Sequence, residues 1–343
     1  MPVVELSYSR LQKLIGNVSR KQISDSLPFL GLDIESENKD SVRVEYSPNR
    51  PDYSTDFGIA LGLEGLFGIK TGAIKLNIKK SRNYSISVTP DVSKIRPFVT
   101  GIVAKHGKID DKIIKQFITM QEDLHFGIGR KRKKSSIGIH DLDKISFPLL
   151  YTTTNRSHEF TPLHSEKILS ISEIISDTNL GKAYGSIIGN STKIPIILDS
   201  NQQTVSFPPI INASVTTVTT KTKNLFVEVT GINKNDAEDM LSVVATILQK
   251  AGFVLETVQI SGAKNSTPKL EQNKISVTPE LINQTLGLNL KTSKIISSLK
   301  KSRLDASSKG KQIICTIPAY RFDIFGPMDL VEETALGYGI QNL

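Results

Sequence analysis

Four carboxylates near the end of the chain have the types and spacing of a metal site. Asp323, Asp329, Glu332 and Glu333 lie in the segment AYRFDIFGPMDLVEETALGYG. On a helix that starts near Asp329, offsets of three and four residues place Glu332 and Glu333 beside it. Carboxylate oxygens of this kind suit Mg²⁺. Because Asp329 and Glu332 also have the spacing of a capping box, the residues alone leave both a magnesium site and a structural helix start open.

A second group of polar residues lies on two predicted strands. The segment SFPPIIN runs from Ser206 to Asn212, and its double proline predicts a sheet edge or a strand end because proline lacks a backbone donor. In the segment NLFVEVT, Glu228 and Thr230 share one face, since residues two apart on a strand point the same way. This face is either the polar side of a half-buried strand or part of a site.

The motifs of several enzyme classes are missing from the sequence. It contains no GxxxxGK[ST], no GxSxG and no HExxH. Cys315 lies in the apolar pattern IICTI and is interpreted as a core residue, and His140 is interpreted as structural. We therefore expect no ATP site in this chain, and any hydrolysis must use water as the nucleophile.

The chain is basic, and its charge is clustered. Among 343 residues, 43 are Lys or Arg and 34 are Asp or Glu, which gives a net charge of +9. Five consecutive bases run from Arg130 to Lys134. Such clusters attract phosphate backbones, so we expect a polyanionic partner, namely RNA. A single cysteine and the lack of an apolar run of about 18 residues predict a cytoplasmic protein with no membrane association.

Hydrophobic periodicity predicts an α+β protein with three parts. An N-terminal structural domain covers 1–83, a mixed α/β domain covers 84–263, and a compact, basic, winged-helix-like module covers 264–343, after a polar linker at 263–272. Helices are predicted over 10–15, 56–67, 110–124, 236–250, 292–300 and 329–338, with a further helix beginning at Pro279. Strands are predicted over 41–46, 99–104, 136–140, 205–207, 224–230, 254–260 and 313–317.

Four segments together resemble one known family. SPNRPDYSTDFGIALGLEGLFGI, GRKRKKSSIGIHDLDKI, SFPPIINASVTTVTTKTKNLFVEVTG and the acidic segment at 319–339 occur in the order found in the phenylalanyl-tRNA synthetase beta subunit of archaeal and eukaryotic type. The resemblance extends over essentially the whole chain. It implies that the middle domain is an editing domain of the B3/B4 type and that the last module is of the B5 type.

The resemblance also implies roles for individual residues. It assigns Asp323, Asp329, Glu332 and Glu333 as magnesium ligands. It places Ser206, Asn212, Glu228 and Thr230 in the editing pocket, with Leu198 or its neighbour Ile197 as a fifth member, although none is assigned as a certain catalytic residue. The pocket residue Glu228 stands where many relatives carry Asp. We expect the bases Arg130, Lys131, Arg132, Lys133 and Lys134 to help hold the tRNA.

The activity implied by the resemblance is that of a phenylalanine–tRNA ligase. In this family two alpha and two beta chains form the enzyme, the alpha subunit charges tRNA with ATP, and the beta subunit removes tyrosine wrongly attached to the phenylalanine tRNA. Full beta subunits continue into a domain resembling the class II synthetase core, so we expect this chain to be a shortened form. Two alternatives are a non-catalytic RNA-binding or assembly module with a decayed editing pocket, and a free-standing Mg²⁺-dependent hydrolase.

Overall fold

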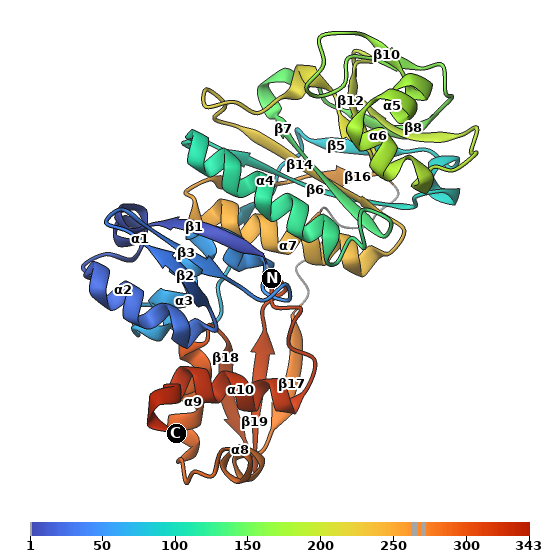
Figure 1. Cartoon of the computed structure of the whole chain (residues 1–343). Helices are drawn as coiled ribbons and strands as arrows, with labels where there is room; N and C mark the ends of the chain where they lie inside the picture. Colours follow the sequence, from blue (N-terminus) through green and yellow to red (C-terminus); the bar gives the residue numbers. More distant parts are fainter. Residues whose placement is uncertain (1, 262–266, 269–271) are drawn as a thin grey trace. The chain divides into compact units, whose positions relative to one another are not determined.

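The computed structural model describes residues 2–261, 267–268 and 272–343, which form two compact units. One unit combines residues 1–76 with 270–343, and the other contains residues 77–269. The two ends of the chain therefore share one unit, shown in blue and red in Figure 1. The linker predicted at 263–272 lies mostly outside the described residues. The division at 83 and 263 stays a prediction.

The N-terminal part of the first unit is a small sheet covered by helices. Its strands pair antiparallel in the order β1-β3-β2. Apolar side chains from the sheet and helices, among them Leu6, Leu11, Val44 and Leu63, form one buried cluster. The elements are β1 (Val3–Ser7), α1 (Tyr8–Ile15), α2 (Arg20–Ser26), η1 (Leu27–Leu30), β2 (Asp33–Glu37), β3 (Ser41–Glu45), η2 (Pro51–Ser54) and α3 (Asp56–Leu66). Thr55 caps α3, since its side chain accepts a hydrogen bond from the Gly58 amide.

The C-terminal part of the first unit has its own core. Three antiparallel strands lie in the order β17-β19-β18, and Ile313, Cys315 and Ile317 of β19 join side chains of the helices in one cluster. The elements are β17 (Asn273–Val277), α8 (Pro279–Leu286), α9 (Thr292–Lys301), β18 (Asp305–Lys309), β19 (Gln312–Ile317), α10 (Pro327–Tyr338) and η7 (Ile340–Asn342). Cys315 is buried here, as predicted for a core residue.

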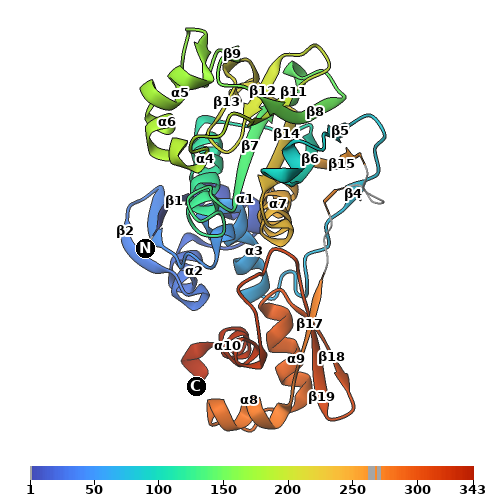
Figure 2. The ribbon, with the colours of Figure 1, turned by 90° about the vertical axis from the view of Figure 1, so that its right-hand side faces the viewer.

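The second unit contains two larger sheets. One has the strand order β13-β12-β11-β8-β5-β16, and the other has the order β4-β15-β6-β14-β7. Figure 2 shows the same unit from the side. The first sheet consists of β5 (Ser85–Val88), β8 (Leu149–Thr154), β11 (Ile194–Leu198), β12 (Thr204–Phe207), β13 (Ile211–Asn212) and β16 (Gln259–Ile260). The second consists of β4 (Ile78–Lys79), β6 (Phe98–Lys105), β7 (Ser135–Asp141), β14 (Leu225–Gly231) and β15 (Val254–Thr257).

The core of the second unit joins both sheets. Val103 and Phe226 of one sheet and Tyr151, Ile197 and Val205 of the other belong to a single buried cluster. The long helix α7 packs on β6 and β14, and α4 packs against β7. The remaining elements are η3 (Val92–Lys94), α4 (Asp111–Phe126), η4 (Leu142–Lys144), β9 (Glu159–Phe160), β10 (Leu169–Ser170), α5 (Ile171–Asp177), α6 (Asn179–Tyr184), η5 (Gly185–Ile187), η6 (Ser214–Thr216) and α7 (Lys234–Lys250).

The predicted α+β class is confirmed, and each predicted helix and all but one predicted strand have a counterpart within a few residues. The single strand predicted over 254–260 is instead two strands, β15 and β16, which belong to different sheets. The helix expected to start at Asp329 begins at Pro327, because proline at a first helical position leaves no unpaired donor. Many shorter elements were not predicted from the sequence: the helices α2, α5 and α6, and the strands β1, β2, β4, β5, β8, β9, β10, β11, β17 and β18. No helix among the described residues is long and apolar enough to span a membrane.

Candidate functional site

A cavity of about 390 Å³ lies in the second unit, between α4, the turn that joins β12 to β13, and the β7–β14 pair. This volume is within the range of small-molecule pockets. Most of the wall is apolar and includes Phe117, Ile137, Pro208 and Pro209. Three of the predicted pocket residues, Ser206, Asn212 and Glu228, also line it. The cavity therefore combines an apolar wall with a few polar groups.

The Glu228 carboxylate is the most deeply buried charge in this wall. The residue is 2% exposed, and its Oε1 accepts a hydrogen bond of 3.0 Å from the Ser206 hydroxyl. Its Oε2 has no hydrogen-bond partner among the described residues. A buried acceptor without a partner is costly, so a ligand that donates a hydrogen bond there is favoured.

The two other polar residues are fixed by the edge of the six-stranded sheet. Ser206 of β12 pairs with Asn212 of β13, and the two prolines form the turn between these strands, as the sequence predicted for a strand end. The Asn212 side-chain amide donates to the Ile139 carbonyl at 3.4 Å. This contact orients the Asn212 side chain at the cavity wall.

Thr230 and Leu198 do not line the cavity. Thr230 is fully buried, and its hydroxyl accepts a hydrogen bond of 2.9 Å from Nε of Arg96, a buried arginine that also donates to the Ser136 hydroxyl at 3.1 Å. Leu198 ends β11 and is half-buried, whereas its neighbour Ile197 belongs to the core between the sheets. Three of the five predicted pocket residues are thus brought together.

His140 lies directly behind Glu228. Its Nδ1 is 2.8 Å from the Thr216 hydroxyl, and its Nε2 is 4.0 Å from Glu228 Oε1. Nε2 has no hydrogen-bond partner within the described part of the chain. From the sequence alone, His140 is interpreted as a structural residue. The sequence does place His140 on a predicted strand, two positions after Gly138. It does not show which strand pairs with that strand, so it could not place His140 beside Glu228.

The basic run from Arg130 to Lys134 forms an unusual connection between α4 and β7. Arg130, Lys131 and Arg132 all have left-handed backbone, with φ of 47°, 54° and 66°. Non-glycine residues adopt this region at a cost. Arg132 points inward, while Arg130 and the three lysines are exposed.

Arg132 has structural contacts. Its Nη1 donates to the Ile210 carbonyl at 2.7 Å, its Nη2 donates to the Glu122 carboxylate at 2.8 Å, and its guanidinium lies over the Tyr184 ring. It therefore ties α4 to the turn that closes the cavity. Lys134 forms an ion pair with Asp236 at 3.3 Å. Of the five predicted RNA contacts, Arg132 is the one that solvent does not reach.

The acidic segment of the first unit surrounds an arginine. Arg321 is buried, and its Nε and Nη2 each donate to the Asp323 carboxylate at 2.8 Å. Nη2 also donates to Glu333. Burial opposes ionisation of Asp323, but the adjacent guanidinium holds the pKa of that carboxyl below its usual value. Two of the four predicted magnesium ligands are thus paired with a cation of the chain itself.

The two other acids are placed differently. The Asp329 carboxylate accepts hydrogen bonds from the amides of Phe325 and Gly326, at 2.7 and 2.8 Å, and so caps α10. Glu332 is exposed. Across the described ranges, no group of three or more His, Cys, Asp or Glu side chains is arranged to hold a metal ion. The arrangement of these residues does not fit a magnesium site, and we derive no chemistry through one.

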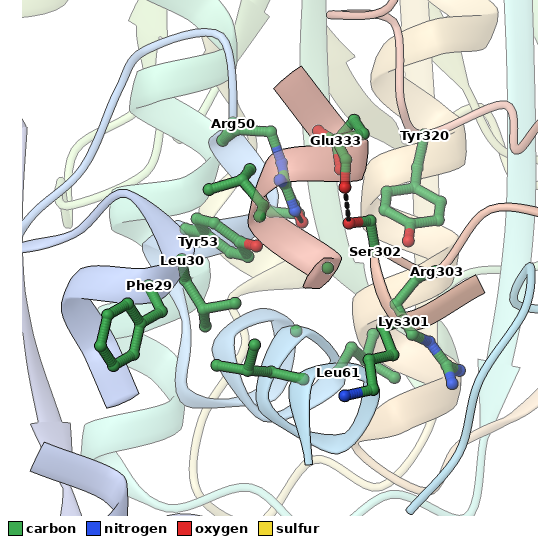
Figure 3. Close-up of a pocket in the computed structure, with 15 residues that line it drawn as sticks. Phe29, Leu30, Arg50, Tyr53, Leu61, Lys301, Ser302, Arg303, Tyr320 and Glu333 are labelled. Atoms are coloured by element: carbon green, nitrogen blue, oxygen red, sulfur yellow. Dashed lines mark hydrogen bonds and ion pairs between the residues drawn. The ribbon is translucent and has the colours of Figure 1, made fainter. Parts of the chain in front are cut away.

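A small cavity lies beside this arginine. It has a volume of about 30 Å³ and is lined by Arg50, Tyr53, Tyr320 and Glu333 (Figure 3). The Arg50 guanidinium stacks on the Tyr53 ring at 3.8 Å and is paired with Asp52 at 2.8 Å. Burial raises the pKa of Tyr53 to about 12. This volume admits about one water molecule, so the region is a packed polar core and not a substrate site.

Comparison with known proteins identifies two domain types in the chain and a set of similar proteins. The family model described as B3/4 domain matches residues 80–241, and the one described as tRNA synthetase B5 domain matches residues 275–340. The phenylalanine–tRNA ligase beta subunits of Archaeoglobus fulgidus and Methanosphaera stadtmanae are 37% and 36% identical to this chain over its full length. Over its full length the chain is similar to phenylalanine–tRNA ligase beta subunits. It spans 62% of the length of these two relatives.

A solved structure of a similar beta subunit has the same fold. An N-terminal fragment of the phenylalanyl-tRNA synthetase beta subunit from Pyrococcus horikoshii superposes with a TM-score of 0.92 at 29% identity. The match covers 98% of this chain and 100% of that fragment. The predicted resemblance to this beta-subunit family is therefore confirmed. The cavity of about 390 Å³ lies in the region that the B3/4 domain model matches, and Arg321 lies in the region that the B5 domain model matches.

Proposed function

We propose that this chain contributes tRNA binding and hydrolytic editing to a phenylalanine–tRNA ligase. Its substrate is tyrosine wrongly esterified to the phenylalanine tRNA, and its site is the cavity lined by Ser206, Asn212 and Glu228. The observation that carries the proposal is the buried Glu228 carboxylate, held by Ser206 in an otherwise apolar cavity. The apolar wall suits an aromatic ring, and the carboxylate suits a phenol.

Discrimination follows from the cost of an unpaired buried acceptor. Tyrosine differs from phenylalanine by one hydroxyl group, which can donate a hydrogen bond to Glu228. Phenylalanine would leave that carboxylate buried and unpaired, and sites of this kind reject the ligand that lacks the hydroxyl strongly. The correctly charged tRNA is thereby spared.

Hydrolysis requires a positioned water molecule. The oxygen of water adds to the ester carbonyl carbon, the bond from that carbon to the ribose oxygen breaks, and a proton from water ends on the ribose hydroxyl. The products are tyrosine and free tRNA. Asn212 lies at the wall with its amide oriented by Ile139 and is our candidate for orienting the ester or the water.

The remaining partners follow from the family. We propose that the chain assembles with an alpha subunit that performs the ATP-dependent charging, as part of an enzyme with two alpha and two beta chains in the cytoplasm. The exposed bases Arg130, Lys131, Lys133 and Lys134 stand at the end of α4, whose residues line the cavity, and would contact the tRNA phosphates.

Deacylation of tyrosyl-tRNA by the purified chain tests the editing function. We expect Glu228→Ala to slow it about 10²-fold or more, because the phenol loses its acceptor. Glu166→Ala, which removes an exposed carboxylate of the same unit, is the matched control and should match the wild-type rate. Equal rates for wild type and Glu228→Ala would sink the assignment. A folded wild-type chain that binds tRNA but clears no tyrosine would instead support the non-catalytic alternative.

A further inference from the structure

The carboxylate of Glu228 stands in a row of glycines. In the five-stranded sheet, Glu228 of β14 pairs with Gly138 of β7 on one side and with Gly101 of β6 on the other. Glycine weakens a strand interior, because it gains no packing and loses more chain entropy than other residues. Neither of these glycines has left-handed backbone. Their backbone conformation therefore does not require glycine. The reason for glycine at these two positions must be the lack of space for a side chain.

The space over Gly138 is filled by polar atoms. A methyl group on Gly138 would lie 2.5 Å from Glu228 Oε1 and 2.5 Å from His140 Nε2. It would also lie 3.1 Å from Asn212 Oδ1. All three atoms are the ends of side chains that converge on this one residue, and the first two distances are too short for any carbon contact. A side chain at position 138 would therefore force the Glu228 and His140 side chains to shift from these positions.

Gly101 serves a different purpose. A methyl group there would lie 2.9 Å from the Val227 carbonyl and 3.3 Å from the Phe226 ring. It would thus disturb the sheet and the core between the sheets, and none of the polar cavity atoms lies within its nearest contacts. Of the two glycines beside Glu228, only Gly138 has the polar side-chain atoms of Glu228, His140 and Asn212 in the space that a side chain would occupy.

We propose that Gly138 is a positioning residue that sets the specificity of the cavity. Because Gly138 has no side chain on this face of β7, the Glu228 carboxylate can lie 4.0 Å from Nε2 of His140. In this position the carboxylate accepts a hydrogen bond from the substrate's hydroxyl group. This inference rests on the proposed editing function. A larger residue at 138 displaces the carboxylate and the imidazole from that position, while the apolar wall stays intact.

The test compares two variants that each add one methyl group. Gly138→Ala should slow hydrolysis of tyrosyl-tRNA about 10²-fold, the scale expected for a misplacement of about 1 Å. Gly326→Ala is the matched control, since nothing lies within 4 Å of its added methyl and its φ of −155° is extended. It should match the wild type. A Gly138→Ala rate within twofold of the wild type would overturn the inference.

A compensating change separates misplacement from simple damage. Glu228→Asp shortens the side chain by one methylene and withdraws its carboxylate from position 138. The double variant Gly138→Ala/Glu228→Asp should therefore melt at a higher temperature than Gly138→Ala and hydrolyse tyrosyl-tRNA at least tenfold faster. Two independent losses, with the double variant worse than either single one, would contradict a shared space.

A crystallographic comparison distinguishes failure of this inference from failure of the proposed function. If the wild-type chain does not clear tyrosyl-tRNA, the editing proposal fails, whatever Gly138 does. The inference then stands if the Gly138→Ala structure shows Glu228 and His140 displaced together. It is overturned if both side chains keep their wild-type positions in that variant.

Discussion

Arg321 and Asp323 form a bidentate ion pair, with Nε and Nη2 of the guanidinium each 2.8 Å from the carboxylate. The pair lies in the segment that the sequence predicts to bind magnesium. Because the guanidinium also reaches Glu333 and the Ser302 carbonyl, it satisfies two carboxylates and one backbone group at once. The negative charge of the motif is thus balanced from within the chain.

Removing the arginine should be strongly destabilising. Arg321→Met keeps much of the side-chain volume but leaves Asp323 and Glu333 buried without their cation. Breaking one partner of such a buried pair costs about 3–5 kcal/mol, which denaturant unfolding would detect. Arg20→Met, which breaks the exposed pair with Glu37, is the control and should change stability far less. Equal effects of the two substitutions would show that the Arg321 pair has no special weight.

Removal of divalent cations should leave the chain as stable as before. The structure supplies an arginine where magnesium was predicted, so dialysis against EDTA should shift the melting temperature by no more than about 1 °C, since no bound-ion free energy is lost. Asp323→Asn should lower the melting temperature equally with and without Mg²⁺. A rise of several degrees on adding Mg²⁺ to the wild type, absent in Asp323→Asn, would instead establish a metal site.

The basic run should separate into two kinds of residue. Arg132→Ala removes the contacts of a buried guanidinium with Glu122 and Ile210, so we expect a loss of about 2–4 kcal/mol in unfolding free energy. Lys133→Ala should leave stability unchanged but weaken tRNA binding and reduce the salt dependence of the affinity by about one phosphate contact. Filter binding across a salt series measures this.

The control for the tRNA prediction is an exposed lysine elsewhere. Lys39→Ala removes the same charge from the turn between β2 and β3. It should alter neither the affinity nor its salt slope. If Lys39→Ala and Lys133→Ala weaken binding alike, the run contributes only net charge.

Local patterns predicted the long, periodic elements but missed most of the short strands and helices. Helical spacing identified α4, in which Phe117 and Met120 are buried, but Ile118 is 55% exposed and lines the cavity. An apolar residue on a helix can face a core or a cavity, and periodicity does not distinguish them. Similarly, the start of α10 depends on which acidic side chain accepts hydrogen bonds from the backbone amides at its N-terminus, and that side chain is Asp329.

The candidate site shows the same division. Strand alternation placed Glu228 and Thr230 on one face, which the pairing of β14 supports. Glu228 lines the cavity, whereas Thr230 is buried away from it. Thr230 differs because its hydroxyl accepts a hydrogen bond from Arg96, which lies 134 positions away in the sequence. The neighbours His140 and Gly138 depend on the register of β7 against β14, which no local pattern specifies.

Stability should depend on pH through Asp239 in α7. Burial, and then the charges of Asp236 and Glu238, raise the pKa of this carboxyl from 3.8 to about 6. Between these two pH values the folded chain holds a proton that the unfolded chain has released, so stability falls as pH rises from about 4 to 6. Above that range the full cost of ionising Asp239 remains. Because the side chain is partly exposed, we expect this cost to be about 1–2 kcal/mol.

Replacing the carboxyl with an amide should remove that cost. Asp239→Asn is expected to be more stable than the wild type by about 1–2 kcal/mol at pH 7 and equal to it near pH 4, because both chains are then uncharged at this position. Denaturant unfolding at the two pH values measures the difference. Asp25→Asn, at an exposed position of α2, is the control for removing one negative charge from a basic protein. A gain from Asp239→Asn that persists at pH 4 would show that packing, and not ionisation, is responsible.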